Sequence, residues 1–448
     1  MPPEQITLEI QDLTDQGDGL GRWEGLAVFV PQTVPGETVR VEVTERAKRF
    51  ARARLLEVQT PAPERTTPSC PVAETCGGCS WQHLRYEAQL QAKQKQVYAA
   101  LQRLGGFHDP KVAPILASEP LHYRNKVAFP VVPGPDRKQL RIGYFQPGSH
   151  DLVEFGSCPA QDERIDQAYR FLLQELPQLG WSAWSRDTDE GLLRHVLLRV
   201  GRRTGETLLT LVTRHPVFGE IKATAARWLE QSPDLRGVCL NLNPHPDQRI
   251  LGKQTELLAG TDEIEEVFGG MRFGVGPETF FQVHTEQAER ILELLLEQWS
   301  SSGDQILWDL YCGIGTFTLP LARHFRKVWG LEWERASVEQ ARRNASRNGI
   351  ANVEFRQGAA EKNLRALPER PDFVFLDPPR QGCDPKVLQQ LRKLGPAQIA
   401  YLSCNPATQS RDLKLLCDSG KYRVTLIQPA DFFPQTPHVE CLVLLVRS

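Results

Sequence analysis

The segment Asp309-Leu-Tyr-Cys-Gly-Ile-Gly-Thr-Phe317 joins an apolar run to a helical pattern and decides the fold of the last third of the chain. An acid, Glu332, stands 23 residues beyond Asp309, at the end of the next apolar run. A glycine-rich turn followed by such an acid is typical of a nucleoside-binding α/β sheet, in which the acid binds the ribose hydroxyls. Thr318 replaces the third glycine of a dinucleotide fingerprint. The turn therefore favours an adenosine ligand without a pyrophosphate, and S-adenosyl-L-methionine is the common one.

Apolar runs alternate with helical patterns from residue 284 to the end of the chain. Residues 288–299 carry apolar side chains at helical spacing. Seven runs predict strands at 305–310, 327–331, 353–356, 372–376, 398–403, 422–427 and 441–446. Such alternation predicts an α/β fold with a doubly wound, Rossmann-like sheet, whose ligands bind beyond the carboxyl ends of the strands. Tyr311, Gly313 and Gly315 should then line the methionine and adenosine of the cofactor.

Length and composition bound the remaining possibilities. The chain has 448 residues, a net charge of -2 and a mean hydropathy of -0.38, which indicates a globular protein of two or three domains. No apolar run approaches the ~18 residues of a membrane span, and the first residues carry no export signal, so we expect a cytoplasmic location. The charge excludes a generally basic nucleic-acid coat. Ten cysteines are too few for a disulfide scaffold and suggest metal ligation or catalysis.

Residues 5–60 alternate apolar and polar side chains and predict a small OB-like β-barrel. The segment Gly17-Asp-Gly-Leu-Gly21 resembles a nucleotide loop, but no helical pattern follows it, so it predicts a hairpin turn. Cationic side chains gather in one run at Arg46, Lys48, Arg49, Arg52 and Arg54. This run is either a solvated strand face or an RNA-contacting edge. A proline-rich linker, 60–71, ends the barrel.

The middle of the chain predicts an α+β domain, with a helical pattern at 81–105 and strands that include 196–200 and 207–212. It contains two basic clusters, one with Tyr123, Arg124 and Lys126 and the other with Arg194, Arg199, Arg202 and Arg203. Cations beside an aromatic side chain suit single-stranded or looped RNA, where unstacked bases need a stacking partner. Ordinary surface charge is the alternative.

Three motifs at the ends of predicted strands supply a nucleophile, a base and a cation: Ser403-Cys-Asn-Pro406, His438-Val-Glu440 and Asp377-Pro-Pro-Arg380. Methylation of uracil at carbon 5 requires a thiolate that adds to carbon 6, a base that removes the carbon 5 proton, and a group that stabilises the enolate. Cys404 is the candidate nucleophile, because Asn405 and Pro406 predict a helix N-terminus that favours the thiolate. The alternative is an inert buried cysteine.

Glu440 is the candidate base, because it opens a strongly apolar strand, where burial raises the pKa of a carboxyl group. A solvated acid at a strand edge is the alternative. Arg380 is placed to stabilise the charge of an enolate or a phosphate. Methyltransferases that act on exocyclic amines usually carry an aromatic residue after Pro-Pro, so arginine here favours carbon as the methyl acceptor.

Four cysteines form a second constellation, with Cys70, Cys76 and Cys79 close in sequence and Cys158 far downstream. Four thiolates can hold a 4Fe-4S cluster or a tetrahedral zinc ion, and the spacing leaves both open. The tight turn Cys76-Gly-Gly-Cys79 argues against four unligated cysteines.

Together these motifs resemble the RNA uridine-5-methyltransferase family, specifically its iron-sulfur branch with an N-terminal TRAM domain, over nearly the whole chain. The resemblance implies formation of 5-methyluridine in structured RNA, ribosomal rather than transfer RNA, through a covalent Cys–uracil intermediate. It favours the 4Fe-4S cluster over zinc, with a structural or RNA-orienting role, and it implies RNA binding by the barrel and the central domain. No protein partner and no membrane are implied. The expected domains are 1–62, 63–283 and 284–448.

The same resemblance assigns individual positions. Cys404 lies in the family's nucleophile motif, Glu440 in its His-Val-Glu motif, and Gln282 and Asp377 match its remaining cofactor contacts. One departure occurs at His284, where the family usually has asparagine.

Three competing functions fit the sequence less well. A DNA cytosine-5 methyltransferase would carry Pro-Cys-Gln followed by Glu-Asn-Val, and neither motif is present. An iron-sulfur, NAD-dependent reductase would need the glycine that Thr318 replaces. An RNA-binding protein with a degenerate enzyme domain would have lost catalytic motifs, and none is lost.

Overall fold

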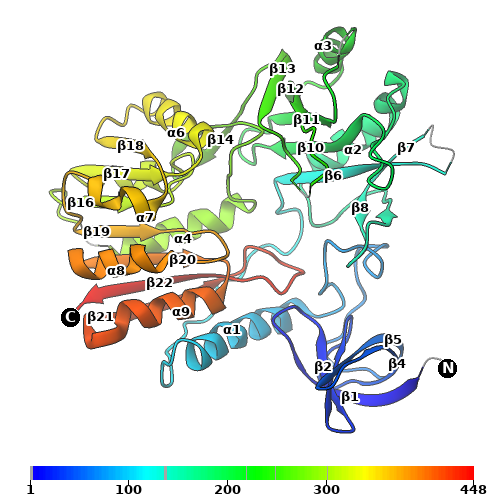
Figure 1. The fold of residues 1–448 in the computed structure, drawn as a ribbon, viewed down its shortest axis with the longest axis horizontal. Coiled ribbons are helices and arrows are strands. Elements are labelled where there is room, and N and C mark those ends of the chain that lie inside the picture. The colour runs from blue at the N-terminus through cyan, green and yellow to red at the C-terminus, as the bar shows by residue number, and fades with distance from the viewer. Residues whose placement is uncertain (1–3, 136–138, 218, 248, 300) are drawn as a thin grey trace.

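The computed structural model describes residues 4–135, 139–217, 219–247, 249–299 and 301–448. An N-terminal barrel, a central sheet with helices and a C-terminal doubly wound sheet follow one another along the chain (Figure 1). The predicted α/β fold class, with its OB-like barrel and central α+β region, is confirmed. The domain limits stay predictions.

The barrel is closed, with strand order β1-β2-β3-β5-β4. Alternate residues such as Leu8, Ile10, Val28 and Val30 fill its interior, which explains the period of two in the sequence. The turn before β2 holds Gly17 at a φ of 93°, and β1 and β2 pair antiparallel, so the predicted hairpin turn is confirmed. The strands are β1 (Gln5–Leu13), β2 (Gly19–Trp23), β3 (Leu26–Val30), β4 (Thr38–Arg46) and β5 (Phe50–Thr60).

The central region is built on a six-stranded sheet with order β13-β12-β11-β10-β6-β7, onto which α2 (Glu163–Glu175) and α3 (Ile221–Gln231) pack. Its strands are β6 (Lys126–Pro133), β7 (Leu140–Ile142), β10 (Leu193–Val200), β11 (Thr207–Thr213), β12 (Leu235–Leu242) and β13 (Gln254–Gly260). Two hairpins flank it: β8 (Tyr144–Phe145) with β9 (Leu152–Val153), and β14 (Ile264–Phe268) with β15 (Met271–Val275). The second hairpin shares its apolar core with the C-terminal sheet.

The C-terminal sheet has seven strands in the order β18-β17-β16-β19-β20-β22-β21, and all seven predicted strands are present. They are β16 (Ile306–Asp309), β17 (Lys327–Glu332), β18 (Val353–Gln357), β19 (Phe373–Leu376), β20 (Gln398–Ser403), β21 (Tyr422–Ala430) and β22 (Glu440–Arg447). Only β22 runs antiparallel to its neighbours in this sheet. The strand order reverses between β16 and β19, which is where such sheets bind ligands.

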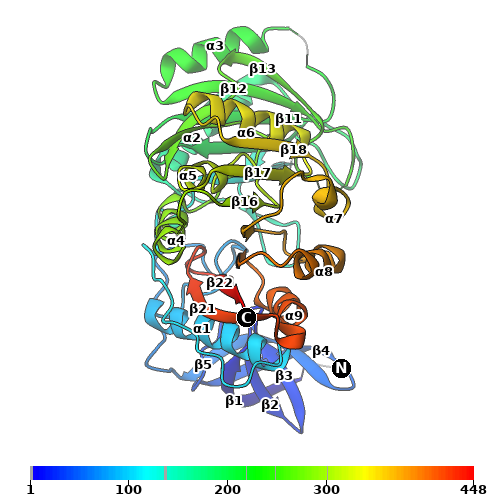
Figure 2. The same cartoon turned by 90° about the vertical axis from the view of Figure 1, so that its left-hand side faces the viewer.

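Helices cover both faces of this sheet, because successive strand residues point to opposite sides, as Leu307 and Trp308 do. The helices are α4 (Thr285–Gln298), α5 (Thr318–Ala322), α6 (Arg335–Arg347), α7 (Ala360–Asn363), α8 (Pro385–Leu394) and α9 (Pro406–Cys417). Helix α1 (Tyr86–Arg103) lies between the barrel and the sheet and packs against α9 and β21 (Figures 1 and 2).

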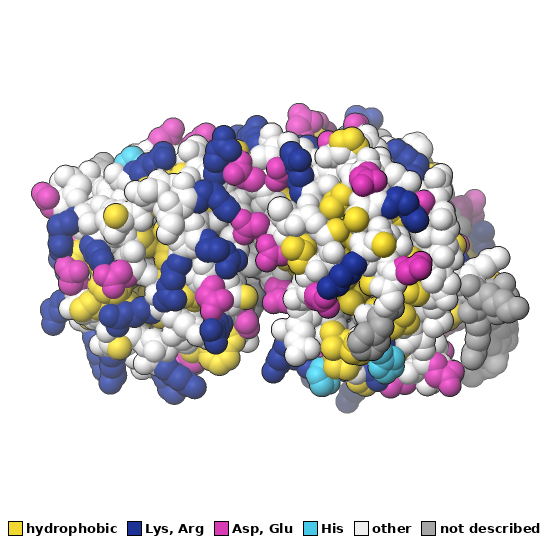
Figure 3. Space-filling view, turned by 90° about the horizontal axis from the view of Figure 1, so that it is seen from above, with side chains coloured by type: hydrophobic (Ala, Val, Ile, Leu, Met, Phe, Trp, Pro, Cys, Tyr) yellow, Lys and Arg dark blue, Asp and Glu magenta, His cyan; other side chains and the backbone are white. Residues whose placement is uncertain are grey.

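The surface mixes charges of both signs. On the face shown in Figure 3, Lys and Arg side chains are interspersed with Asp and Glu side chains. In the basic run of the barrel, Arg46 pairs with Glu4 at 3.4 Å and Arg54 pairs with Glu42 at 3.0 Å. This agrees with a solvated strand face, and an RNA-contacting role of the run stays a prediction. None of the described helices is long and apolar enough to span a membrane.

Candidate active site

The predicted site residues converge on one edge of the C-terminal sheet. Glu332 is the last residue of β17, Asp309 ends β16, Asp377 follows β19 and Cys404 follows β20. Because β22 runs antiparallel, its first residue, Glu440, lies at the same edge. Sheet topology alone therefore assembles five side chains that are widely separated in the sequence.

The glycine-rich turn faces the acid that sequence analysis assigned to the ribose. The Gly313 N–H donates to Glu332 Oε2 at 3.0 Å, and the backbone N–H of Glu334 donates to Glu332 Oε1 at 2.8 Å. Gly313 and Gly315 have φ values of 53° and 87°, which an L side chain rarely adopts. Half-buried Tyr311 lies beside this turn. The geometry thus fixes Glu332 against a turn that leaves room for a ligand's close approach.

Two buried carboxyl groups separate the cofactor turn from the catalytic residues. Burial raises the pKa of Asp309 to about 7, against the lowering effect of a hydrogen bond that Thr318 Oγ1 donates to Asp309 Oδ2 at 2.6 Å. Thr318 therefore binds a carboxylate at the position where a dinucleotide site has glycine. Burial, with the neighbouring Asp309 charge, also raises the pKa of Asp377 to about 7. Gln282 Nε2 donates to Asp377 Oδ2 at 3.2 Å.

Cys404 and Glu440 face each other across two adjacent strands. The antiparallel register ends with the pair Ser403–Cys441, so Cys404 directly follows the last paired residue of β20 and Glu440 directly precedes its partner in β22. The charge of Glu440 acts on the Cys404 thiol. Glu440 is only 6% exposed, and its Oε2 atom has no hydrogen-bond partner among the described residues. Burial raises its pKa well above the ordinary value, the charge of Asp377 adds to the rise, and Arg380 opposes it. The raised pKa that the sequence predicted for Glu440 is present.

The surroundings of Cys404 differ in one respect from the sequence-based expectation. Asn405 caps α9, as predicted, since its side chain accepts from the N–H groups of Ala407 and Thr408 at 3.1 and 3.4 Å. The expected lowering of the thiol pKa is wrong for this structure. Burial raises the pKa of Cys404 to about 11, Glu440 adds to the rise, and Arg380 opposes it. The Asn405 side chain occupies the helix N–H donors, so they do not compensate the buried thiolate.

Arg380 is the cation nearest to this thiol. Its backbone carbonyl accepts hydrogen bonds from Asn405 Nδ2 at 3.0 Å and Thr408 Oγ1 at 3.1 Å, which fasten its loop to the start of α9. The exposed guanidinium hydrogen-bonds the Cys404 thiol and lowers its pKa. A fixed cation beside a nucleophile can stabilise an anion that forms there.

The other cysteines at this edge are less accessible. Cys312 is 5% exposed and Cys383 is 2% exposed, whereas Cys404 is half-buried. Burial raises the pKa of Cys383 to about 12, and its backbone N–H donates to Asp412. Cys404 is therefore the best placed of the three to meet a substrate.

The predicted RNA-binding role of the two basic clusters is wrong for their buried members, and for their more exposed members, such as Arg203, it stays a prediction. Tyr123 is 1% exposed, donates its hydroxyl to the Pro434 carbonyl at 3.1 Å and stacks on His284. Arg194 and Arg199 are 2% and 5% exposed, and Arg199 Nη2 donates to the Thr279 carbonyl at 2.6 Å. Sequence reasoning could not distinguish buried cations from surface ones.

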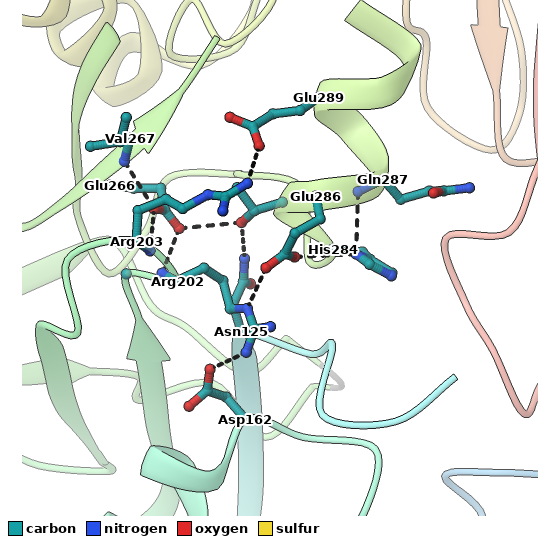
Figure 4. Close-up of polar contacts among 12 residues, drawn as sticks. Asn125, Asp162, Arg202, Arg203, Glu266, Val267, His284, Glu286, Gln287 and Glu289 are labelled. Atoms are coloured by element: carbon teal, nitrogen blue, oxygen red, sulfur yellow. Dashed lines mark hydrogen bonds and ion pairs between the residues drawn. The ribbon is translucent and has the colours of Figure 1, made fainter. Parts of the chain in front are cut away.

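Arg202 and Arg203 belong to an ionic network at the start of α4 (Figure 4). This network borders the segment that contains Gln282. Arg202 pairs with Asp162 and with Glu286, and Arg203 pairs with Glu289. Their backbone N–H groups both donate to buried Glu266. The network connects the central sheet to α4, so these arginines are engaged within the protein.

Two further residues of this network act on the same segment. Asn125 Nδ2 donates to the Gln282 carbonyl at 2.9 Å and to Thr285 Oγ1 at 3.0 Å. His284 Nδ1 accepts from the Gln287 N–H at 3.4 Å and so caps α4. Histidine thus performs here a capping role for which asparagine is also well suited.

The four cysteines of the second constellation lie near enough for their charges to act on one another. Burial raises the pKa of Cys76, Cys79 and Cys158, the last to about 12, and charges on neighbouring cysteines raise each of them further. These three cysteines and Cys70 form no disulfide bonds. The part of the chain that the structure describes contains no group of three or more His, Cys, Asp or Glu side chains that could hold a metal ion.

Comparisons with known proteins agree with this architecture. Residues 85–448 match the tRNA (uracil-5-)-methyltransferase family, and residues 3–56 match the TRAM domain. An uncharacterized RNA methyltransferase of Nostoc sp. is 46% identical over 99% of this chain and 97% of its own length. One of Synechocystis sp. is 44% identical over 98% of this chain and 95% of its own length.

Among solved structures, the chain is similar to the tRNA (uracil-54, C5)-methyltransferase of Pyrococcus abyssi in complex with S-adenosyl-L-homocysteine. The two are 28% identical, with a TM-score of 0.79, over 98% of this chain and 100% of the other. The chain therefore belongs to the tRNA (uracil-5-)-methyltransferase family, carries a TRAM domain, and is an S-adenosylmethionine-dependent RNA methyltransferase.

Proposed function

We propose that this protein methylates carbon 5 of a uridine in structured RNA through a covalent bond between Cys404 and the uracil ring. The observation that carries the proposal is the placement of Cys404 opposite Glu440 across β20 and β22, with Arg380 beside the thiol. The target base must leave its stack to reach this edge, at a cost of a few kcal/mol that a loop reduces.

In the proposed reaction, the Cys404 thiolate adds to carbon 6, and the ring electrons move onto the carbonyl oxygen as an enolate. Carbon 5 of the enolate then attacks the methyl group that S-adenosylmethionine supplies, the S–CH3 bond breaks, and S-adenosyl-L-homocysteine leaves. Glu440 then takes the carbon 5 proton, the double bond re-forms, and the Cys404 thiolate leaves. Arg380 lowers the pKa of the thiol and therefore favours its thiolate, and the same charge stabilises the enolate.

We propose that S-adenosylmethionine binds along the carboxyl ends of the C-terminal strands. Glu332 binds the ribose hydroxyls, while Gly313 and Gly315 allow close approach of the nucleoside. Tyr311 lines the same turn, and the Gln282–Asp377 pair borders the methionine end.

Ribosomal RNA is the substrate that the iron-sulfur resemblance implies, and transfer RNA is the second candidate. A specific observation favours transfer RNA, because the similar Pyrococcus abyssi enzyme is a tRNA methyltransferase. Both candidates contain looped uridines, which a thiolate reaches more readily than stacked ones. A cytoplasmic location stays a prediction.

For the second constellation we propose that Cys70, Cys76, Cys79 and Cys158 hold a 4Fe-4S cluster with a structural or RNA-orienting role. The support is chemical: Cys158 joins a segment with three cysteines, and burial with neighbouring cysteine charges penalises the thiolate forms of Cys76, Cys79 and Cys158. A bound metal cluster offsets that penalty, because coordination deprotonates thiols. The methyl transfer itself requires no electron, so no step passes through this cluster.

The experiment that tests the function uses purified protein with methyl-labelled S-adenosylmethionine and with ribosomal or transfer RNA lacking the modification. We expect label in 5-methyluridine in only one RNA class, as nucleoside analysis will show. RNA that contains 5-fluorouridine should trap the wild-type protein in a denaturation-resistant complex, because fluorine cannot leave as a proton does. Label in another nucleoside would contradict the proposal.

A further inference from the structure

The segment that delivers Glu440 to the active site is held by the N-terminal part of the chain. Residues 431–439 join β21 to β22 and lead directly into Glu440. We call this segment the base-bearing loop because it determines where Glu440 begins the strand. Most of the loop is buried: Asp431 and Phe432 are 0% exposed and Val439 is 1% exposed. The loop contains no regular secondary structure, so its conformation depends on side-chain contacts from elsewhere.

The first contact is a fully buried ion pair with α1. Lys93 Nζ lies 2.6 Å from Asp431 Oδ1, and both side chains are 0% exposed. Lys93 Nζ also donates to the Phe433 carbonyl at 3.0 Å. Burial lowers the pKa of Lys93, and the Asp431 carboxylate opposes that shift. Because a lone charge is costly in such a place, the pair fixes the start of the loop to α1.

The second contact is a pair of glutamines. Gln89 Oε1 accepts from the Gln435 N–H at 2.9 Å, and Gln89 Nε2 donates to Gln435 Oε1 at 2.9 Å. The Gln435 carbonyl accepts from the Trp81 N–H at 2.9 Å. The polar groups of Gln435 are thus bound by the N-terminal segment on both backbone and side chain.

Gln435 needs this support because of its backbone. Its φ is 67°, in the left-handed region that residues other than glycine rarely adopt. That conformation is strained for an L side chain and persists only where neighbouring groups enforce it. The contacts with Gln89 act directly on this strained residue and therefore help to select the loop conformation.

We propose that Gln89 is a positioning residue for the general base: through Gln435 it holds the base-bearing loop in the conformation that places Glu440 opposite Cys404. Lys93 assists by fixing Asp431 at the other end of the loop. The proposal rests on Glu440 being the base in the function proposed above. Cys404 is positioned separately, by β20 and the cap of α9. Loss of Gln89 should therefore impair proton removal more than thiolate addition.

The test compares Gln89→Ala with two matched variants of the same helix. Gln91 is exposed, so Gln91→Ala controls for loss of a glutamine. Val97 is 1% exposed and packs in the core beneath the sheet, so Val97→Ala controls for simple destabilisation of α1. Each variant receives methyl-labelled S-adenosylmethionine and substrate RNA in a single turnover, below its measured Tm. The readouts are methyl transfer and the fraction of protein in a denaturation-resistant RNA complex.

We expect Gln89→Ala to transfer the methyl group but to release product at least tenfold more slowly, so that a methyl-labelled complex accumulates. Gln91→Ala should match the wild type, and Val97→Ala should lower Tm without accumulating the complex. If Gln89→Ala does not fold, Gln435→Gly replaces it. Glycine adopts the same φ without strain, and loss of the side-chain amide should give a smaller delay of the same kind.

Release by the folded Gln89 or Gln435 variant at the wild-type rate would overturn the inference, as would an equal delay in Val97→Ala. Glu440→Gln, measured in parallel, separates this failure from that of the proposed function. If Glu440→Gln accumulates the labelled complex and Gln89→Ala does not, only the positioning role is lost. If Glu440→Gln turns over normally, Glu440 is not the base, and the positioning role of Gln89 is lost as well.

Discussion

The catalytic edge of the C-terminal sheet and the four-cysteine region of the central domain were both assembled from residues far apart in the sequence. At the catalytic edge, Asp377, Cys404 and Glu440 occupy the ends of hydrogen-bonded strands. In the four-cysteine region, Cys70, Cys76 and Cys79 lie on irregular segments, and Cys158 precedes α2. Strand ends bring the residues of the first region together, whereas the second gathers its thiols on segments without regular secondary structure.

The difference shows what each kind of scaffold determines. Strand register fixes neighbours to within one residue, so the pair Ser403–Cys441 brings Cys404 and Glu440 to the same end of β20 and β22. Loops carry no such register, and buried thiols repel one another as thiolates until a metal neutralises them. Substitutions should therefore damage the two regions in different ways.

The largest effect should come from Cys404. Replacing Cys404 by Ala removes the nucleophile, and we expect methyl transfer to fall on the order of 10³-fold or more, with loss of the 5-fluorouridine complex. Cys383→Ala, at a neighbouring buried thiol, should retain both activities in the folded protein. Steady-state assays and denaturing gels measure these outcomes. A covalent complex that persists in Cys404→Ala would place the nucleophile at another cysteine.

This contrast also explains how much of the site could be predicted from the sequence. Apolar periodicity predicted all seven strands of the C-terminal sheet. Because the strands were located correctly, motifs such as Asp-Pro-Pro-Arg380 could be placed at their ends. Burial could not be predicted. Tyr123 and Arg199 carry the residue types of an RNA surface but lie in the interior. The raised pKa of Cys404 was missed because it depends first on burial and then on the charge of Glu440, which is distant in sequence.

The next largest effect should be a loss of iron when a cysteine of the four-cysteine region is replaced. We expect the protein, purified without oxygen, to contain about four irons and to lose most of them in Cys158→Ser, as in Cys76→Ser, because a cubane needs all four thiolates. Cys417→Ser, at another half-buried cysteine, should keep the iron. Metal analysis and acid-labile sulfide determination provide the measurement. Stoichiometric zinc without sulfide, or full iron in Cys158→Ser, would contradict the proposed cluster.

A smaller effect is expected for cofactor affinity. Glu332→Ala removes a carboxylate fixed against the glycine-rich turn, and hydrogen bonds to a charged group contribute about 1.5–3 kcal/mol. We therefore expect S-adenosylmethionine to bind roughly tenfold to a hundredfold more weakly, by titration calorimetry. The exposed neighbour Glu334→Ala should change the affinity little, because only its backbone contacts Glu332. Appreciable binding of NADH by the wild type would instead revive the reductase alternative.

The smallest effect tests whether the charges at the catalytic edge act on Cys404 as the structure indicates. Only the thiolate is alkylated, so in the absence of RNA the iodoacetamide reaction at Cys404 should rise about tenfold per pH unit from pH 7 to 10, toward a pKa of about 11. Glu440→Gln removes an anion that raises this pKa and should speed alkylation at pH 9 severalfold. Arg380→Met removes the opposing cation and should slow it.

Mass spectrometry of the peptide that contains Cys404 follows the reaction, and the Cys417 peptide of the same sample is the control. Burial alone raises the pKa of Cys417, also to about 11, so neither substitution should alter its rate. Opposite shifts at Cys404 with an unchanged rate at Cys417 would demonstrate a local electrostatic pair. If both substitutions changed the alkylation rate of Cys404 in the same direction, Glu440 and Arg380 would not act on the thiol as opposing charges. A pH midpoint of alkylation near the ordinary ~8.5 would show that the thiol pKa is not raised.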